Sequence, residues 1–250
     1  MNETTQKYLY IVGIPLILLA LFIAAWFGWG WWQESQKPTA PTPFSFTVDA
    51  ASQPSLEKEV VIPEGFPGDA ATIARNRIKE LRAAIDGNSA DYVSWMDLAI
   101  LYKTISDYEG AREVWEYVKK AAPMDSVAFQ NLGGLYDLYL KDYPKAEENY
   151  LRAVEISPNQ AGVYLGLHEL YRYSYKTDSS AAVDILKKGI KATGSPVNFD
   201  LRVMLAGYYK EKGDKKNAIL YYTEAKEQAI DLNNQSLIDQ MEREIGALQQ

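Results

Sequence analysis

Residues 126–160, SVAFQNLGGLYDLYLKDYPKAEENYLRAVEISPNQ, carry two sets of residues at helical spacing. The first set is Phe129, Leu132, Gly133 and Tyr136, and the second is Asp142, Ala146, Tyr150 and Ala153. Steps of three and four residues place side chains on one face of an α-helix. The stretch therefore predicts two consecutive amphipathic helices, a helix A and a helix B, with Asp142 where helix B begins.

Both sets recur four times along the chain, with a period of about 35 residues. The helix A sets are Trp95/Leu98/Ala99/Tyr102, Phe129/Leu132/Gly133/Tyr136, Tyr164/Leu167/His168/Tyr171 and Arg202/Leu205/Ala206/Tyr209. The helix B sets are Asp107/Ala111/Trp115/Val118, Asp142/Ala146/Tyr150/Ala153, Asp178/Ala182/Leu186/Gly189 and Asp214/Ala218/Tyr222/Ala225. Each aspartate is predicted to be the N-cap of its helix B, where a carboxylate accepts hydrogen bonds from the free N–H groups of the first turn.

This order of residues resembles the tetratricopeptide repeat family over about residues 92–231. The resemblance implies an all-α fold in which about four helix pairs stack into a right-handed α-solenoid. The pairs are predicted within residues 92–232, at 92–125, 126–160, 161–196 and 197–232. The pattern is weakest in the third pair, where insertions and Gly189 loosen it.

A capping helix is predicted at each end of the repeats, because the terminal pairs of a solenoid otherwise expose their stacking faces. The N-terminal cap is predicted within residues 69–91 and the C-terminal cap within residues 233–250. The residues expected to point inward are Ile73, Ile78, Leu81 and Ile85 in the first cap, and Leu237, Met241, Ile245 and Leu248 in the second.

Residues 8–32, YLYIVGIPLILLALFIAAWFGWGWW, contain no charged side chain. As a helix they are about 37 Å long at 1.5 Å per residue, which is enough to cross a hydrocarbon core of ~30 Å. Tyrosines at one end and tryptophans at the other match the preference of these rings for the headgroup level. The segment is predicted to be a transmembrane helix. A cleaved signal peptide is the alternative, but the run is long and bulky Trp26 and Phe27 follow Ala24 and Ala25.

The orientation of this predicted span depends on few charges, since Lys7 and Lys37 flank it on opposite sides. We expect the short N-terminal tail, residues 1–7, to be cytoplasmic and the repeats to be extracytoplasmic. Residues 33–68 hold six of the eleven prolines and are predicted to be an extended linker. Within it, Phe44, Phe46 and Val48 are assigned to the free linker. The second apolar patch, residues 60–62, is expected to dock partially on the repeats.

Composition excludes several kinds of chemistry. The chain has no cysteine and one histidine, so disulfides, thiolate catalysis and multi-histidine metal sites are absent. A net charge of -7 argues against nucleic-acid partners. His168 is interpreted as a packed side chain with one backbone partner, because no second histidine and no nucleophile accompany it. We predict no catalytic, metal or cofactor site, no cofactor and no small-molecule substrate.

The resemblance implies that the A helices line a groove for a peptide or a partner helix. The predicted groove residues are Val93, Met96, Ile100, Lys103, Val127, Gln130, Gly134, Asp137, Leu138, Leu165, Glu169, Arg172, Tyr173, Val203, Gly207 and Lys210. This surface is apolar with charges of both signs, which suits a polypeptide ligand. The alternative is that these residues contact the linker or a capping helix. Of the clamp residues of chaperone-tail-binding relatives, only Asn131 is present.

The predicted function is that of a single-pass, membrane-anchored, non-catalytic scaffold or assembly factor of the bacterial envelope. Its predicted partners are a protein or peptide in the groove and the lipid bilayer around residues 8–32. The alternatives are a chaperone-like holdase of the envelope, or an accessory protein of a translocon or of cytochrome maturation, which the layout resembles.

Overall fold

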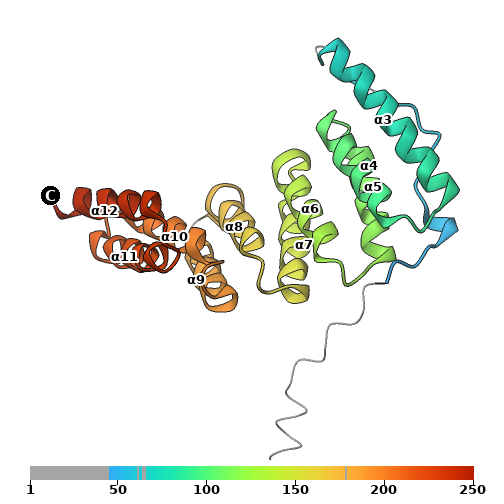
Figure 1. Ribbon diagram of the computed structural model, residues 1–250. Helices are drawn as coiled ribbons and strands as arrows, with labels where there is room; N and C mark the ends of the chain where they lie inside the picture. The colour runs from blue at the N-terminus through green and yellow to red at the C-terminus, as the bar shows by residue number, and fades with distance from the viewer. Residues whose placement is uncertain (1–44, 61, 64–65, 178) are drawn as a thin grey trace, which may run out of the picture. The chain divides into compact units, whose positions relative to one another are not determined.

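The computed structural model describes residues 45–60, 62–63, 66–177 and 179–250. These residues confirm an all-helical solenoid with no β-strand in the described part (Figure 1). The helices are α3 (Gly68–Gly87), α4 (Tyr92–Thr104), α5 (Tyr108–Ala121), α6 (Ser126–Leu135), α7 (Tyr143–Ile156), α8 (Ala161–Glu169), α9 (Ala181–Thr193), α10 (Phe199–Glu211), α11 (Lys215–Asp231) and α12 (Gln235–Gln249). A 3-10 turn, η2 (Ala50–Ser52), precedes them.

The predicted tail and membrane span, residues 1–32, lie outside the described residues. Every helix of the described part is too short or too polar to cross a bilayer. The predicted span therefore stays a prediction from the apolar composition of residues 8–32.

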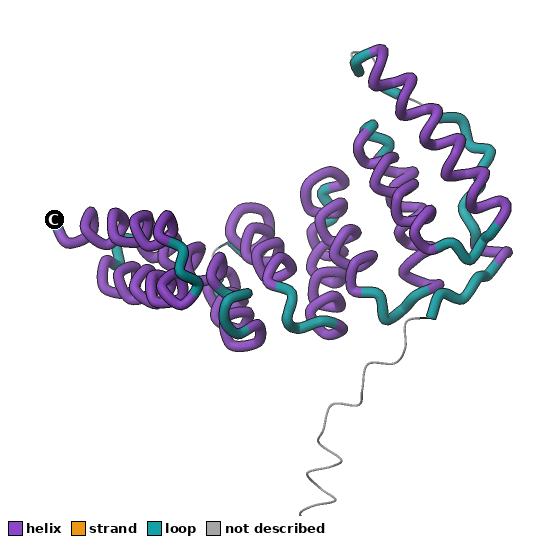
Figure 2. Tube along the Cα trace, viewed as in Figure 1, coloured by secondary structure: helices purple, strands orange, loops and turns teal. Residues whose placement is uncertain are grey.

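Each helix packs against the next one in sequence, from α3 through to α12, and short loops join them (Figure 2). The A helices α4, α6, α8 and α10 alternate with the B helices α5, α7, α9 and α11. Contacts also link α6 to α8 and α8 to α10. The A helices α6, α8 and α10 thus lie beside one another, and the outer surface of the four A helices is called the A-helix face below.

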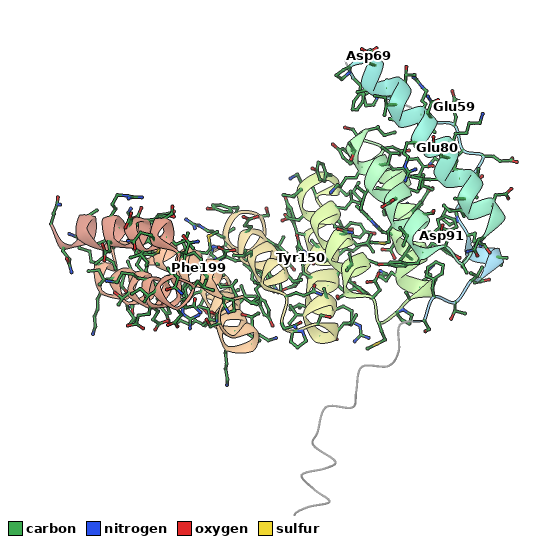
Figure 3. All side chains as sticks on the ribbon, in the orientation of Figure 1. Glu59, Asp69, Glu80, Asp91, Tyr150 and Phe199 are labelled. Atoms are coloured by element: carbon green, nitrogen blue, oxygen red, sulfur yellow. The ribbon has the colours of Figure 1, made fainter. Side chains whose placement is uncertain are left out.

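Tyr150 of α7 is wedged between α6 and α8, and Figure 3 labels it where the second and third helix pairs meet. A Cβ atom on Gly133 of α6 would lie 2.6 Å from Tyr150 Cδ1, and one on Gly166 of α8 would lie 2.8 Å from Tyr150 Cζ. Real Cβ atoms do not approach this closely, so the ring fits only because both positions are glycine.

Gly189 of α9 plays a similar part in the third pair. It is buried, and a Cβ atom there would lie 2.7 Å from Tyr164 Cγ and 2.9 Å from Leu201 Cδ1. Gly189 therefore departs from the repeat pattern in sequence, as predicted, yet it packs tightly, because the glycine admits Tyr164 into the contact between α8 and α9.

The turns from helix A to helix B share one local structure. Ser106, Lys141 and Gly213 have φ of 65°, 57° and 75°, in the left-handed region. Each is followed at once by an aspartate N-cap, as predicted: Asp107 accepts from Gly110 N at 2.8 Å, Asp142 from Lys145 N at 3.3 Å and Asp214 from Asn217 N at 3.0 Å. The left-handed residue reverses the chain and the carboxylate then caps the new helix.

The third turn departs from this pattern, and the prediction of Asp178 as the N-cap of the third helix B is wrong. Asp178 lies outside the described residues, and α9 begins at Ala181 with Ser180 as its N-cap. The Ser180 hydroxyl donates to Asp184 Oδ2 at 2.6 Å, while Ser179 Oγ accepts from Ala181 N at 3.3 Å. The inserted residues move the start of the helix, so serines replace the aspartate at this end.

Part of the predicted linker is folded onto the N-terminal helices. This docked segment comprises residues 45–60, 62–63 and 66, and it packs on α3, α4 and α5. The ring of Phe46 meets Tyr92 and Tyr117 edge-on, with centroids 5.9 and 6.0 Å apart. Thr47 N donates to Ala121 O at 2.8 Å, and Arg82 Nη2 donates to Lys58 O at 2.7 Å.

The assignment of Phe46 to a free linker is therefore wrong, because two tyrosines distant in sequence form a niche for its ring. The docking predicted for the second apolar patch is confirmed for Val60 and Ile62, which are partly buried against the core.

The capping helices bury most of the residues predicted to point inward. In α3, Ile78, Leu81 and Ile85 are buried, and Ala71 and Ala74 continue their stripe. Ile73 is 69% exposed, so its predicted inward position is wrong. The reason is that residues 71, 74, 78, 81 and 85 form one face at steps of three and four, and residue 73 lies off that face. In α12, Met241 and Leu248 are buried, while Leu237 and Ile245 are partly buried.

Two glycine-to-alanine substitutions test the left-handed turn. Gly213→Ala places a Cβ atom at φ 75°, and we expect it to lower the free energy of unfolding by about 1–2 kcal/mol. Gly246→Ala, inside α12 and with nothing near the new Cβ, is the matched control and is expected to raise it by about 0.5–1 kcal/mol. Urea unfolding followed by circular dichroism measures both, and two effects of equal sign would contradict the proposed turn.

Candidate functional site

The predicted groove residues lie on the A-helix face, and most are accessible. The exposed ones are Val93, Ile100, Val127, Leu138, Glu169, Tyr173 and Lys210, and the partly buried ones are Lys103, Gln130, Gly134, Leu165, Arg172, Val203 and Gly207. The contacts given above for the docked segment involve α3, α5 and the start of α4, and none of them falls on these residues.

Two predicted groove residues are buried. Met96 is only 7% exposed and belongs to the hydrophobic core, since α3 and α5 both pack against its helix α4. The prediction that Met96 faces a ligand is wrong, because this side chain is buried among the helices. Asp137 is only 4% exposed, and it lies in a π-helical turn that continues α6.

Two of the A helices end in π-helical turns, which the sequence pattern did not predict. These are η3 (Tyr136–Leu140) after α6 and η4 (Leu170–Ser174) after α8. A π turn widens the helix by one residue and is often found at functional sites. Here the turns carry four of the predicted groove residues, Asp137, Leu138, Arg172 and Tyr173.

A pocket of about 440 Å³, called the C-terminal pocket, opens on the A-helix face between α8 and α10. Its lining residues are Leu165, Arg172, Asp200, Val203, Met204, Gly207, Glu211 and Tyr222. Arg172 forms an ion pair with Glu211 and lies over the ring of Tyr208, 5.4 Å from its centroid. Leu165, Val203 and Met204 make much of the lining apolar. Arg172, the one cation among the lining residues, is already paired with Glu211.

A second pocket of about 200 Å³, called the central pocket, lies where α4, α6, α7 and α8 meet. Its lining residues are Lys103, Gln130, Asn131, Gly134, Leu135, Leu138, Tyr139, Tyr150 and Gly162. The structure thus brings Lys103, Gln130 and Leu138 together, as the groove prediction required, and adds the hydroxyl of Tyr150. Lys103 Nζ lies 5.8 Å from the centroid of the Trp115 ring.

Two carboxylates act on the Tyr150 hydroxyl, although neither of them lines the central pocket. Burial, followed by the charges of Asp137 and Glu169, raises the pKa of the Tyr150 hydroxyl. Burial also raises the pKa of Asp137, while the Ser174 hydroxyl and the charge of Lys141 oppose that shift. Asp137 Oδ1 has no hydrogen-bond partner among the described residues.

Sequence reasoning placed Tyr150 in the core and missed its hydroxyl. One feature of the sequence could have indicated the position of this hydroxyl. Groove positions of two successive A helices are occupied by glycines, Gly134 in the second pair and Gly162 and Gly166 in the third. Positions without side chains leave the space through which a long B-helix side chain reaches the A-helix face.

His168 is buried as predicted, and its ring has one backbone partner, with Nδ1 2.8 Å from Ala182 O. Burial lowers the pKa of His168, which keeps the ring neutral at pH 7. Within the described residues, no three histidine, aspartate or glutamate side chains are grouped to hold a metal ion.

The family model of the tetratricopeptide repeat matches residues 127–160 and 199–235. These two stretches, which correspond to α6–α7 and α10–α11, therefore match the tetratricopeptide repeat. No curated protein matches the chain in sequence.

Several solved structures match this chain in part. The crystal structure of MamA has a TM-score of 0.52 and 17% identity, covering 70% of this chain and 99% of its own. YrrB, described as a TPR protein with an unusual peptide-binding site, has a TM-score of 0.46 and 14% identity, covering 68% and 92%. PilW, a type IV pilus biogenesis factor, has a TM-score of 0.44 and 16% identity, covering 63% and 77%. The similarity to MamA shows a common fold.

The buried carboxyl of Asp137 predicts a pH-dependent effect on stability. Its pKa is raised in the folded state, so the folded protein holds this proton more tightly than the unfolded chain. The resulting stabilisation is complete below the unfolded pKa of about 3.9 and is lost as the pH rises through the folded value. We expect Asp137→Asn to raise the free energy of unfolding by about 1 kcal/mol at pH 7 and to have little effect at pH 3.

Urea unfolding at the two pH values measures this difference. Glu227→Gln removes the same charge from an exposed position of α11 and serves as the control. A loss of stability in Asp137→Asn at pH 7 would show that the carboxylate is well paired.

Proposed function

We propose that the protein is a membrane-anchored, non-catalytic scaffold or assembly factor that binds another polypeptide along its A-helix face. Tetratricopeptide repeats are protein-interaction modules, and two of the four helix pairs match their family model. The observation that carries the proposal is the C-terminal pocket, an apolar hollow of about 440 Å³ on an accessible face. Such a pocket receives a large apolar side chain of a ligand.

The surface outside the C-terminal pocket is also partly apolar. Val93, Ile100, Val127 and Leu138 are exposed on the A helices. A row of exposed aliphatic side chains on neighbouring helices is a binding surface for an amphipathic helix or an extended peptide. Lys210 Nζ donates a hydrogen bond to Glu244 Oε2 of α12 at 2.7 Å. The lysine therefore lies at the C-terminal end of the surface, beside the capping helix.

The proposed location follows from the sequence. Residues 8–32 are long and apolar enough for one membrane span, which makes the bilayer a second partner. In this proposal residues 1–7 are cytoplasmic and the repeats are extracytoplasmic. The docked segment leaves residues 33–44 as the connection between the span and the folded repeats.

A chaperone-like holdase is the second candidate function. The observation that favours it is the same row of exposed aliphatic residues, which can bind many unfolded chains weakly. A scaffold binds one partner tightly through fixed pockets, whereas a holdase binds a broad set of clients.

Crosslinking in native membranes tests the proposal with the full-length chain. In the variant Leu165→Glu/Val203→Glu, two charges enter the apolar C-terminal pocket, and we expect the yield of crosslinked partner to fall about tenfold. Leu220→Glu on α11 introduces a charge at another exposed leucine and is expected to behave as the wild type.

Equal yields from all three proteins would contradict the groove as the binding site. One dominant crosslinked protein supports the scaffold, and a broad smear supports the holdase. Protease added to intact cells in the same experiment reports the orientation, since extracytoplasmic repeats are digested and cytoplasmic repeats are protected.

A further inference from the structure

A third pocket, called the B-helix pocket, is lined mainly by two consecutive B helices. It has a volume of about 490 Å³, roughly three times the ~150 Å³ of an engineered cavity that binds benzene, so it has room for more than one side chain. Its lining residues come from α5, α6 and α7 and are Lys119, Phe129, Glu148, Asn149, Leu151, Arg152 and Glu155. None of them belongs to the predicted groove, so this pocket is separate from the binding surface proposed above.

The docked segment shows what covers the corresponding place in the first helix pair. Gln53 Nε2 lies 3.5 Å from the Tyr117 hydroxyl, and Lys58 Nζ forms an ion pair with Glu113 Oε2 at 3.2 Å. On its other side, Lys58 O accepts a hydrogen bond from Arg82 Nη2 of α3 at 2.7 Å. This stretch of extended chain therefore bridges α3 and α5 and runs antiparallel to α5.

The repeat register places the B-helix pocket at the equivalent position one pair further on. The helix B sets of the first two pairs are 35 residues apart, so Tyr117 corresponds to Arg152 and Glu113 corresponds to Glu148. Both Arg152 and Glu148 line the pocket. The helix α3 precedes and packs on α4 as α5 precedes and packs on α6. The space that the docked segment covers between α3 and α5 thus recurs between α5 and α7, where it is an open pocket.

The charges of the B-helix pocket favour a ligand that carries a cation. Three of its four lining charges have partners, in the ion pairs Arg152–Glu155 at 2.9 Å and Lys119–Glu116 at 2.7 Å. The fourth, Glu148, is exposed and has no ion pair within the described part of the chain. Its counterpart Glu113 binds Lys58 of the docked segment. A lysine or arginine of a ligand can pair with Glu148 in the same way.

The pocket also offers apolar surface between its charged ends. Phe129 and Leu151 line it and are partly buried against the hydrophobic core. In the docked segment, Leu56 comes between the two polar contacts and is likewise partly buried against the core. An aliphatic side chain at the same place in a ligand removes apolar surface of Phe129 and Leu151 from water.

Two differences between the pairs determine which ligand fits. Arg152 stands where the first pair has Tyr117, and its guanidinium only donates hydrogen bonds, so the ligand needs an acceptor there. The niche of Phe46 is not repeated, because Ser126 stands where the first pair has Tyr92. An aromatic residue at the position of Phe46 is therefore not required in the ligand.

We propose that the B-helix pocket binds an extended segment of a partner polypeptide in the way that residues 53–58 bind between α3 and α5. The segment carries an acceptor opposite Arg152, an aliphatic residue over Phe129 and a lysine or arginine opposite Glu148. The spacing of these three residues is that of Gln53, Leu56 and Lys58. This second interaction surface lies outside the A-helix face and does not depend on the proposed function.

A fluorescent synthetic peptide with the sequence of residues 50–60 tests this proposal on the full-length chain by fluorescence anisotropy. The peptide contains the pattern described above but lacks Phe46, which anchors the docked segment in its own niche. We expect saturable binding. Glu148→Lys should weaken it about fivefold, because a repulsion replaces an attraction between exposed charges. The peptide variant Lys58→Glu should bind the wild type equally weakly and regain affinity for Glu148→Lys.

Three further protein variants locate the bound peptide. Glu227→Lys makes the same change in charge at an exposed position of α11 and should behave as the wild type. Leu165→Glu/Val203→Glu, in the C-terminal pocket, should also leave the affinity unchanged, because the two surfaces are separate. Glu113→Lys removes the carboxylate that the first pair offers to Lys58, and it should not weaken binding of the peptide.

The outcomes separate this proposal from the proposed function. Equal affinities of the wild type and Glu148→Lys overturn it, and so does an absence of saturable binding. Weaker binding to Glu113→Lys alone shows that the peptide only exchanges with the docked segment, which overturns it as well. Weaker binding to Leu165→Glu/Val203→Glu alone places the peptide on the A-helix face, which overturns the second surface and supports the proposed function.

Discussion

The stack depends on how bulky side chains of the B helices fit beside small residues of the A helices. Trp115, Tyr150, Leu186 and Tyr222 occupy the same position in the four B helices, and all are buried. Tyr150 shows the constraint most directly, since its ring lies against Gly133 of its own pair and Gly166 of the next. One side chain thereby joins three helices, and close packing of this kind leaves no room for a methyl group at either glycine. The left-handed turns and aspartate caps then fix where each B helix starts relative to its A helix.

The same constraint determines the chemistry of the A-helix face. A side chain inserted from a B helix ends near the surface of the A helices, so its tip becomes part of the groove. Tyr150 contributes a hydroxyl to the central pocket, and Tyr222 lines the C-terminal pocket, where Leu165 and Val203 make the floor apolar. Leu186, at the corresponding position of the third pair, has no polar atom to contribute. The character of the groove therefore changes from one pair to the next, although the backbone pattern is repeated.

Much of the fold follows from the spacing of residues, and less of the site does. Steps of three and four predicted the helices, and the aspartates at 107, 142 and 214 predicted three helix starts, because both signals are local. The docking of Phe46 was missed because Tyr92 and Tyr117, which form its niche, lie far away in sequence. The π turns at η3 and η4 were missed because they depend on how a helix end packs rather than on composition. They bury Asp137, whose predicted position on the groove gave no hint of burial.

Asp137 is one of four side chains with a buried nitrogen or oxygen atom that lacks a hydrogen-bond partner among the described residues, the others being Trp115, His168 and Gln228. Asp125 accepts hydrogen bonds from Val127 N and Ala128 N, Asn149 donates to Lys145 O, and Asn198 donates to Ile190 O. These groups cap or brace helices, so their burial is compensated within the fold. Asp137 carries an ionisable group with one oxygen unpaired, and burial raises its pKa. For Asp137 the cost of this burial follows from the π turn η3, which carries the side chain into the interior.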